Sequence, residues 1–208
     1  MSKRIVALVC ITALLMTLLA ACGGKKQVIN GIQVEEQKIE NQYSDGIVLL
    51  MTNKTNNDCD MEVTITFLDA NGNKVDSYDN FKIYACAKDA TIAQPFYSSK
   101  PFVSCNYNVT PQAMSLYRPI DTDLKAEVKQ NGEDVTVTVT NNGTETAHYV
   151  EYYTLYYKGG KLIGVGTGYC DDDKDELKPG ASISDQDHCY DPYDKVSVYV
   201  HSKIDPKQ

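Results

Sequence analysis

The sequence contains no tryptophan, only three histidines and none of the common enzyme signatures. It has no Gly-x-Ser-x-Gly elbow, no His-Glu-x-x-His helix and no phosphate-binding loop ending in Lys-Ser or Lys-Thr, so no motif supports a serine hydrolase, a zinc peptidase or a nucleotide-binding enzyme. The histidines (His148, His188 and His201) are scattered along the chain. We therefore predict a protein that is not an enzyme and uses no cofactor. A metal-assisted hydrolase is the less favoured alternative.

Positive charge is also scarce. Lys and Arg total 20 against 28 Asp and Glu, which gives a formal net charge of -8 at pH 7. Loss of Lys3 and Arg4 with an N-terminal signal would bring the charge to -8 - 2, or about -10. Nucleic acids and anionic lipid surfaces attract clustered Lys and Arg. The composition therefore predicts no nucleic-acid partner and no electrostatic adhesion to a membrane.

The chain has one long hydrophobic run, residues 5–19, which follows Lys3 and Arg4 and ends at Leu19-Ala20-Ala21-Cys22. Basic residues, a short apolar core and small residues before a cut site make up a secretory signal, and the last four residues resemble the bacterial lipobox. We predict a signal peptide over residues 1–21, lipidation of Cys22 and a flexible tether over residues 22–30. Acyl chains would then hold the protein at the bacterial cell envelope, outside the cytoplasm. The alternative is an uncleaved transmembrane anchor, because the run is near the lower length limit for spanning a bilayer.

Helical periodicity is nearly absent after residue 22, whereas strand patterns are frequent. Residues 135–140 alternate Val and Thr, which predicts a strand with one buried face. The sequence between residues 61 and 68 alternates in the same way. Asn141-Asn142-Gly143 and Lys158-Gly159-Gly160-Lys161 read as turns. The chain is therefore predicted to be all-β.

The strand patterns repeat after about 88 residues. Thr52-Asn53 matches Thr140-Asn141, each at the end of a strand and before a turn. About seven short strands in each copy predict two tandem immunoglobulin-like β-sandwich domains, residues 31–110 and 121–208, joined by a linker at residues 111–120. The predicted strands are residues 32–39, 47–51, 61–68 and 102–109 in the first copy, and 124–130, 135–140, 149–157, 162–169 and 195–201 in the second.

One segment carries a family resemblance. Tyr153-Thr154-Leu155-Tyr156-Tyr157 resembles the Phe-x-Leu-Tyr-Asp signature of the FxLYD domain, and Ile65-Thr66-Phe67-Leu68-Asp69 is a looser match in the first copy. Leu177-Lys178-Pro179-Gly180 is similar to the family's turn before the next strand, whereas the first copy has Ala87-Lys88-Asp89-Ala90. The resemblance implies small extracytoplasmic β-sandwich modules of bacterial surface proteins. It implies no activity for particular residues.

Five cysteines lie beyond the predicted lipidation site, an odd number. Thiols outside the cytoplasm tend to pair, and Cys86–Cys105 and Cys170–Cys189 are both separated by about nineteen residues. We predict these two disulfides and an unpaired Cys59. Each bridge would contribute about 3 kcal/mol in the chain-entropy description. The alternative is that all five cysteines remain reduced and buried.

Tyrosine is concentrated late in the chain, with nine of its fifteen copies from residue 149 onward. In Tyr152-Tyr153 and Tyr156-Tyr157, neighbouring rings must point to opposite faces of the sheet. One set would enter the core, and the outward set would form an aromatic surface suited to protein or carbohydrate contact. The alternative is that the outward rings cover their own sheet or the neighbouring copy.

The densest charge run is residues 171–176, where Asp171, Asp173 and Asp175 are weak candidates for calcium ligands. The run lacks the Gly and the distal Glu of an EF-hand, and Lys174 adds a positive charge. We therefore predict a solvated turn and no metal site.

The alternating residues Gly164, Gly166 and Gly168 lie inside a strand pattern and do not open a helix. They indicate a bulge or a close approach of another backbone, because dinucleotide-binding glycines occur where a strand passes into a helix.

Together these features predict a lipid-anchored extracytoplasmic lipoprotein that acts as a noncovalent interaction or binding module. Its partner would be another envelope protein or a surface glycan, and it would bind through the outward tyrosines or nearby loops. A purely structural spacer in an envelope assembly is the alternative.

Overall fold

The computed structural model describes residues 25–41 and 45–204, and these form antiparallel strands with no α-helix among them. Within these ranges no helix is long and apolar enough to cross a membrane. The strands in chain order are β1 (Lys25–Ile29), β2 (Ile32–Glu40), β3 (Asp45–Asn53), β4 (Cys59–Leu68), β5 (Lys74–Cys86), β6 (Thr91–Ser98), β7 (Ser104–Gln112), β8 (Arg118–Pro119), β9 (Leu124–Asn131), β10 (Asp134–Asn141), β11 (Ala147–Lys158), β12 (Lys161–Tyr169), β13 (Glu176–Leu177), β14 (Ser182–His188) and β15 (Lys195–Ile204), with the short 3-10 helix η1 (Asp121–Asp123) before β9.

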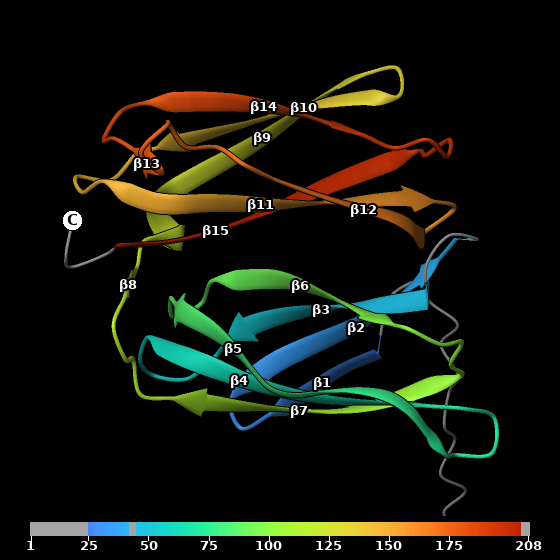
Figure 1. Ribbon diagram of the computed structural model, residues 1–208. Helices are drawn as coiled ribbons and strands as arrows, with labels where there is room; N and C mark the ends of the chain where they lie inside the picture. Colours follow the sequence, from blue (N-terminus) through green and yellow to red (C-terminus); the bar gives the residue numbers. More distant parts are fainter. Residues whose placement is uncertain (1–24, 42–44, 205–208) are drawn as a thin grey trace, which may run out of the picture.

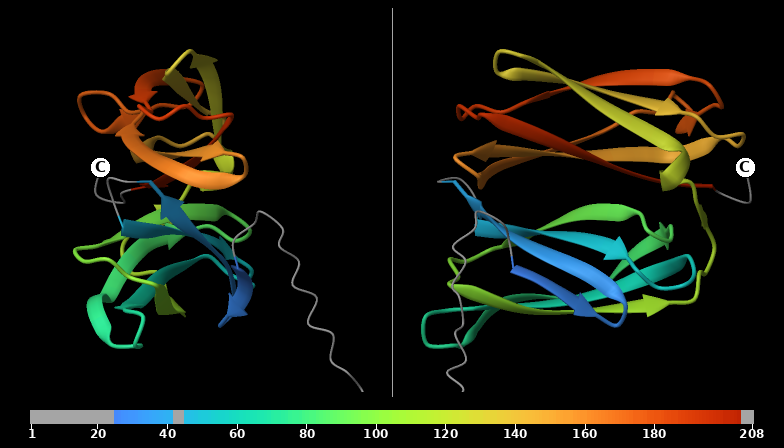
Figure 2. Two further views of the ribbon diagram at one scale, coloured as in Figure 1. Left: turned by 90° about the vertical axis from the view of Figure 1, so that its right-hand side faces the viewer. Right: turned by 180° about the vertical axis from the view of Figure 1, so that it is seen from behind.

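The strands form four sheets stacked in layers (Figure 1). In the first half of the chain, residues 25–112, the outer sheet has the order β5-β4-β7 and the inner sheet the order β1-β2-β3-β6. In the second half, residues 118–204, the inner sheet has the order β12-β11-β15-β8, with β13 also pairing with β11, and the outer sheet has the order β14-β10-β9. The two inner sheets face each other in the middle of the stack (Figure 2).

Alternating side chains account for the strands that were predicted best. Val135, Val137 and Val139 of β10 are fully buried. On the other face of β10, the hydroxyl groups of Thr138 and Thr140 hydrogen-bond to serines of β14. A strand with one buried face needs this pattern, so the predicted all-β sandwich architecture is confirmed.

Each half has its own hydrophobic core between its outer and inner sheets. The first core includes Met61, Val63, Ile65 and Phe67 of β4, which all point inward. The second core is built around the valines of β10 and the rings of Tyr152 and Tyr156 on β11. Every one of these side chains is at most 1% exposed.

A buried asparagine occupies the same place in each half. Asn53 at the end of β3 donates its amide hydrogens to the carbonyls of Asn57 and Cys86. Asn141 at the end of β10 does the same to Glu145 and Leu177. Both side chains are completely buried, and each fixes the turn that follows its strand. The predicted correspondence between these asparagines therefore has a structural basis.

The correspondence shifts in register elsewhere. Asp89 and Gly180 both have positive φ, and their backbone N–H groups donate to the carbonyls of Asn53 and Asn141, so the turn ending at Gly180 matches residues 86–89 rather than 87–90. The two FxLYD-like segments also differ in facing. Ile65 points into the first core, whereas Tyr153, its predicted counterpart, points away from the second core.

Two segments expected to be connectors have structure of their own. Residues 25–29, placed in the tether by the sequence, form β1 and pair with β2. The linker contains β8, which pairs with the end of β15, and Ser115, whose backbone N–H and hydroxyl group both donate to Asp60. The signal peptide and Cys22 lie outside the described residues.

Candidate functional site: the junction between the two halves

A third hydrophobic cluster lies between the two inner sheets, and we call it the junction. The first half contributes aliphatic side chains from β2, β3 and β6, and the second half contributes tyrosine and leucine from β11 and β12. Val48 and Leu155 are completely buried there. The buried members of the junction are Ile39, Val48, Leu50, Ala93, Tyr153, Leu155 and Leu162.

The junction decides where the four candidate tyrosines lie. Tyr152 and Tyr156 enter the second core, and Tyr153 and Tyr157 point to the opposite face, so the predicted alternation is confirmed. The outward pair, however, does not form a free binding face. Tyr153 is only 8% exposed, because the aliphatic face of the first half covers it. Their position matches the alternative given from the sequence, in which the outward rings pack against the neighbouring copy.

Hydrogen bonds and an ion pair join the halves around this apolar centre. The Tyr157 hydroxyl donates to Gln37 Oε1 over 2.8 Å. The Lys161 ammonium group lies 2.6 Å from Glu40 Oε2, where both side chains are exposed. Burial, together with the nearby Tyr199, raises the pKa of Tyr157 to about 12, so its phenol remains a neutral donor.

His201 makes a further, partly buried polar contact between the halves. Its Nδ1 atom lies 3.0 Å from Asp121 Oδ1, and its Nε2 atom lies 2.9 Å from the backbone carbonyl oxygen of Tyr84 in the first half. Both partners accept hydrogen bonds, so both ring nitrogens must donate, which requires the positively charged imidazolium form. Asp121 Oδ1 also accepts the backbone N–H of Ser202 over 2.7 Å.

The surroundings of His201 favour this charged form. Burial alone would lower the pKa of His201, but the charge and hydrogen bond of Asp121, the Tyr84 carbonyl and the charge of Glu151 outweigh it and raise the pKa above 6.5. The ring therefore gains a proton on folding more readily than an exposed histidine. Sequence reasoning missed this site, because Tyr84 and His201 are 117 residues apart and no local pattern connects them.

The alternating glycines of β12 lie against the edge of β14. A Cβ atom on Gly168 would come within 2.5 Å of Asp185 Oδ2, and one on Gly166 would overlap the Asp187 carboxylate. The Tyr152 hydroxyl donates to Asp185 over 2.9 Å, and the Thr154 hydroxyl donates to Asp187. The pairing of β12 with β11 shifts in register between Tyr156 and Tyr157, opposite Gly164, in line with the predicted bulge. Side-chain carboxylates, and not the backbone of another segment, occupy the space beside Gly166 and Gly168.

The predicted disulfides are wrong for this structure. No disulfide joins any of the five cysteines in the described chain. On β4, the strand between them, Cys86 lies opposite Cys59 and Cys105 lies opposite Phe67, eight residues away. Eight residues of strand span about 27 Å, far beyond the reach of a disulfide.

The second predicted pair is separated in a similar way. A Cβ atom on Gly164 would lie 3.2 Å from Cys189 Sγ, which places that sulfur beside residue 164 of β12. Cys170 lies just past the far end of β12, about 20 Å further along the strand direction. Equal sequence spacing did not predict proximity, because each pair spans the length of a strand.

The acidic run at residues 171–176 forms a tight turn. Asp171 Oδ2 accepts the backbone N–H of Val150 over 2.9 Å, and Asp172 Oδ1 accepts the N–H groups of Lys174 and Glu176. Among the described residues there is no group of three or more His, Cys, Asp or Glu that could hold a metal ion. A hydrogen bond to β11 accounts for the placement of Asp171, and hydrogen bonds within the turn account for that of Asp172.

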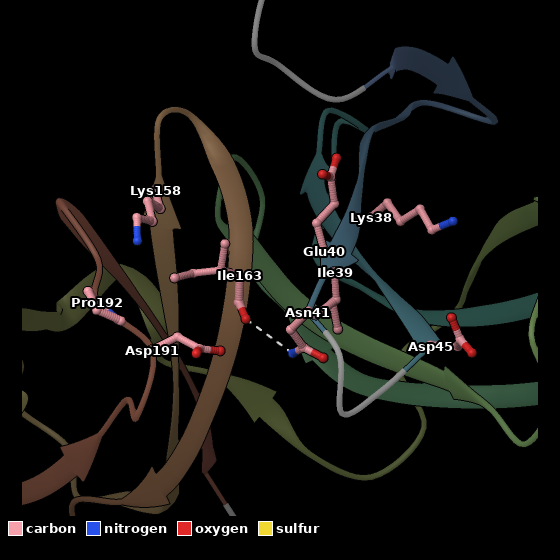
Figure 3. Close-up of a pocket in the computed structure, with 9 residues that line it drawn as sticks. All are labelled: Lys38, Ile39, Glu40, Asn41, Asp45, Lys158, Ile163, Asp191 and Pro192. Atoms are coloured by element: carbon pink, nitrogen blue, oxygen red, sulfur yellow. Dashed lines mark hydrogen bonds between the residues drawn. The ribbon is translucent and has the colours of Figure 1, made fainter.

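A cavity of about 800 Å³ opens at one edge of the junction (Figure 3). Across it, the Asn41 amide of the first half donates to the backbone carbonyl of Ile163 in the second half over 3.1 Å. The walls carry charges of both signs. The lining residues are Lys38, Ile39, Glu40, Asn41, Asp45, Lys158, Ile163, Asp191 and Pro192.

No protein-family model matches the chain, and no curated protein matches it. Among solved structures, a red sea bream transglutaminase is similar over 84% of this chain, at 11% identity and a TM-score of 0.29, and the chain spans 29% of that protein's length. A chaperone–tip adhesin complex of CFA/I fimbriae biogenesis is similar over 77% of this chain and 93% of its own, at 9% identity and a TM-score of 0.19. At such low TM-scores, neither likeness assigns a fold or an activity to this chain.

Proposed function

We propose that this chain is a lipid-anchored extracytoplasmic protein of the bacterial envelope, and that its two halves act together as one rigid structural spacer. Each half is interpreted as an immunoglobulin-like sandwich, and the two are interpreted as tandem copies. Cys22 would carry the acyl chains, and the signal peptide would be removed. The FxLYD resemblance supports the same location. The proposal includes no enzymatic step.

The junction is the observation that carries this proposal. Tandem modules that recognise ligands usually keep their sheet faces or loops available for binding. In this protein, one sheet face of each half is buried against the other half. Tyr153 and Leu155 are buried against the first half, and His201 bonds to its backbone. Large apolar contacts, here reinforced by partly buried hydrogen bonds, oppose domain motion. Rigidity between an anchored end and a free end is what a spacer requires.

The repeated strand order supports the sandwich interpretation. In each half, a sheet of three consecutive partners (β2-β3-β6 and β9-β10-β14) packs over a second one (β5-β4-β7 and β12-β11-β15). Two antiparallel sheets with this interleaved order are typical of immunoglobulin-like modules. Because each half has its own core, a tandem origin explains the shared positions of Asn53 and Asn141.

Crosslinking in intact cells tests the spacer proposal. An amine-reactive crosslinker should join the wild-type protein to other envelope proteins. The Cys22→Ala variant should be released from the membrane or blocked in maturation, and should lose these crosslinks. A Tyr190→Ser variant, changed at a ring that is 85% exposed, is the matched control and should retain both. Wild-type protein recovered from the membrane with an unmodified Cys22, as shown by mass spectrometry, would refute the lipid anchor.

Noncovalent recognition remains a second candidate, because the cavity at the edge of the junction has the volume of a small-ligand pocket. Its mixed charges, with Lys158 and Asp191 both in the lining, suit a polar or zwitterionic ligand. Envelope peptides and surface glycans should then raise the melting temperature of the wild-type protein, and the Lys158→Ala variant should lose that response. No shift with any ligand would leave the spacer as the better account.

A further inference from the structure

The first half holds two cysteines directly opposite each other. Cys59 begins β4, Cys86 ends β5, and the two residues are paired across these antiparallel strands. Residues paired in this way have Cα atoms about 4.5–5.5 Å apart. A disulfide needs a Cα separation of about 4.4–6.8 Å, so the backbone already lies within range.

The second half shows what usually fills this position. Its counterpart to the Cys59–Cys86 pair is Ala147 opposite Leu177, an ordinary pair of apolar side chains. The equivalence follows from the buried asparagines, because Asn53 donates to the carbonyl of Cys86 and Asn141 donates to that of Leu177. Apolar packing therefore suffices at this place in the fold. The first half nevertheless has a sulfur atom on both strands.

We propose that Cys59 and Cys86 are joined by a disulfide when the chain folds under oxidising conditions. The two thiols are oxidised to one S–S bond and release two protons. The two electrons and the two protons pass to an external disulfide of the glutathione class, which is reduced to two thiols. Under reducing conditions the same backbone positions hold Cys59 and Cys86 as two thiols, as in the present structure.

The surroundings place the reaction during folding rather than after it. Cys86 is completely buried and Cys59 is 5% exposed. Burial, followed by the charges of nearby aspartates, raises the pKa of both thiols. The thiolate that attacks a disulfide is therefore disfavoured in the folded state, and the finished bond is shielded from reductants.

The bond would also brace the junction. Tyr84, whose carbonyl oxygen accepts the hydrogen bond of His201, is two residues from Cys86 on β5. Asp60, next to Cys59, accepts the backbone N–H of Ala85 over 2.9 Å and both the backbone N–H and the hydroxyl group of the linker residue Ser115. A covalent link between β4 and β5 would thus hold the part of the first half that contacts the second.

Peptide mapping tests the proposal directly. The full-length protein in detergent is reduced and unfolded, refolded in a buffer of reduced and oxidised glutathione, alkylated and digested with trypsin. Cleavage places Cys59 on the peptide of residues 55–74, Cys86 on residues 83–88 and Cys105 on residues 89–125. We expect residues 55–74 joined to residues 83–88, with a mass lower by two hydrogens than the sum and released by reduction.

Variants and thermal unfolding provide the controls. Cys59→Ser and Cys86→Ser should each abolish the joined peptide, and Cys105→Ser should leave it intact. The wild-type protein should melt about 5–10 °C higher when oxidised than when reduced, because the bond closes a loop between residues 59 and 86. Residues 83–88 joined to residues 89–125, or both cysteines fully alkylated after oxidative refolding, would overturn the proposal.

Discussion

The two halves share a strand order but close the same edge of their sandwiches with different chemistry. In the first half, where β5 meets β6, Phe96 lies with its ring centroid 5.2 Å from those of Tyr78 and Phe81, in edge-to-face contact. In the second half, where β12 meets β14, the corresponding edge is filled by Asp185 and Asp187.

This difference shows that the same strand order can be closed at its edge either by aromatic rings or by carboxylates. Aromatic rings close the first edge by burying apolar area. The second edge holds partly buried carboxylates, because Tyr152 and Thr154 supply hydroxyl donors and the facing strand has glycines at alternate positions. The stability of the apolar edge should therefore depend on the volume of its aromatic side chains. The stability of the polar edge should depend on the glycines, which leave space for the carboxylates. The predictions below test this contrast and then the junction that joins the halves.

The largest effect is expected at the aromatic edge. Phe96→Ala removes a ring that is 1% exposed and contacts two others, so the free energy of unfolding should fall by about 3–5 kcal/mol. Urea denaturation measures this loss, and Phe96→Leu should lose much less. A loss below about 1 kcal/mol for Phe96→Ala would show that the rings do not support the first half.

The next effect is expected at His201. His201→Gln keeps one donor and loses the charge, and should cost about 1.5–3 kcal/mol at pH 6 because a hydrogen bond to a charged group is lost. The folded-state pKa is raised above 6.5, so the stability from His201 is fully present below pH 6.5 and is lost as pH rises through the folded pKa. Melting temperature measured from pH 5 to pH 9 should therefore fall more in the wild type than in His201→Gln. Parallel curves would show that a charged His201 does not stabilise the contact with Asp121 and Tyr84.

At the polar edge, Gly166→Ala should destabilise the second half by about 1–3 kcal/mol, because the new methyl group meets the Asp187 carboxylate. Asp187→Ala removes that obstacle. The double variant should therefore lose less stability than the sum of the two single variants, as measured by urea denaturation. Additive losses would show that the glycine and the carboxylate are not in contact.

The smallest effect is expected at Tyr157. Tyr157→Phe removes the hydroxyl group that donates to Gln37 and keeps the ring in the junction, so the loss should be about 0.5–1.5 kcal/mol. Tyr190→Phe, at an exposed ring, should change nothing. Equal losses of stability in the two variants would show that the Tyr157 hydroxyl group does not stabilise the contact between the halves.

Strands with one buried face were predictable from the sequence, and strands that depend on distant partners were not. Residues 135–140 and 61–68 alternate cleanly, because each packs one face against its own core. Strand β14 escaped prediction, since Ile183 is its only aliphatic side chain and its inward-facing carboxylates need Tyr152 and Thr154 from another strand. The cysteine pairs were mispredicted because loop length carries no information about register.

One local feature of the sequence does indicate the junction. Residues 47–51 read Ile-Val-Leu-Leu-Met, a continuous apolar run in which no residue is more than 7% exposed. Such a run is typical of a strand buried on both faces, whereas a half-exposed strand alternates. It indicates that β3 has a neighbour on its outer face. Which segment that neighbour is, and that His201 reaches Tyr84, follow only from the packing of the two halves.

Residual dipolar couplings of backbone amides in solution test most directly whether the two halves form one rigid body. With the junction closed, couplings from residues 25–112 and from residues 118–204 should fit a single alignment tensor in the orientation of Figure 1. Two tensors of clearly different magnitude would show that the halves move independently, and would contradict both the buried junction and the spacer proposed from it.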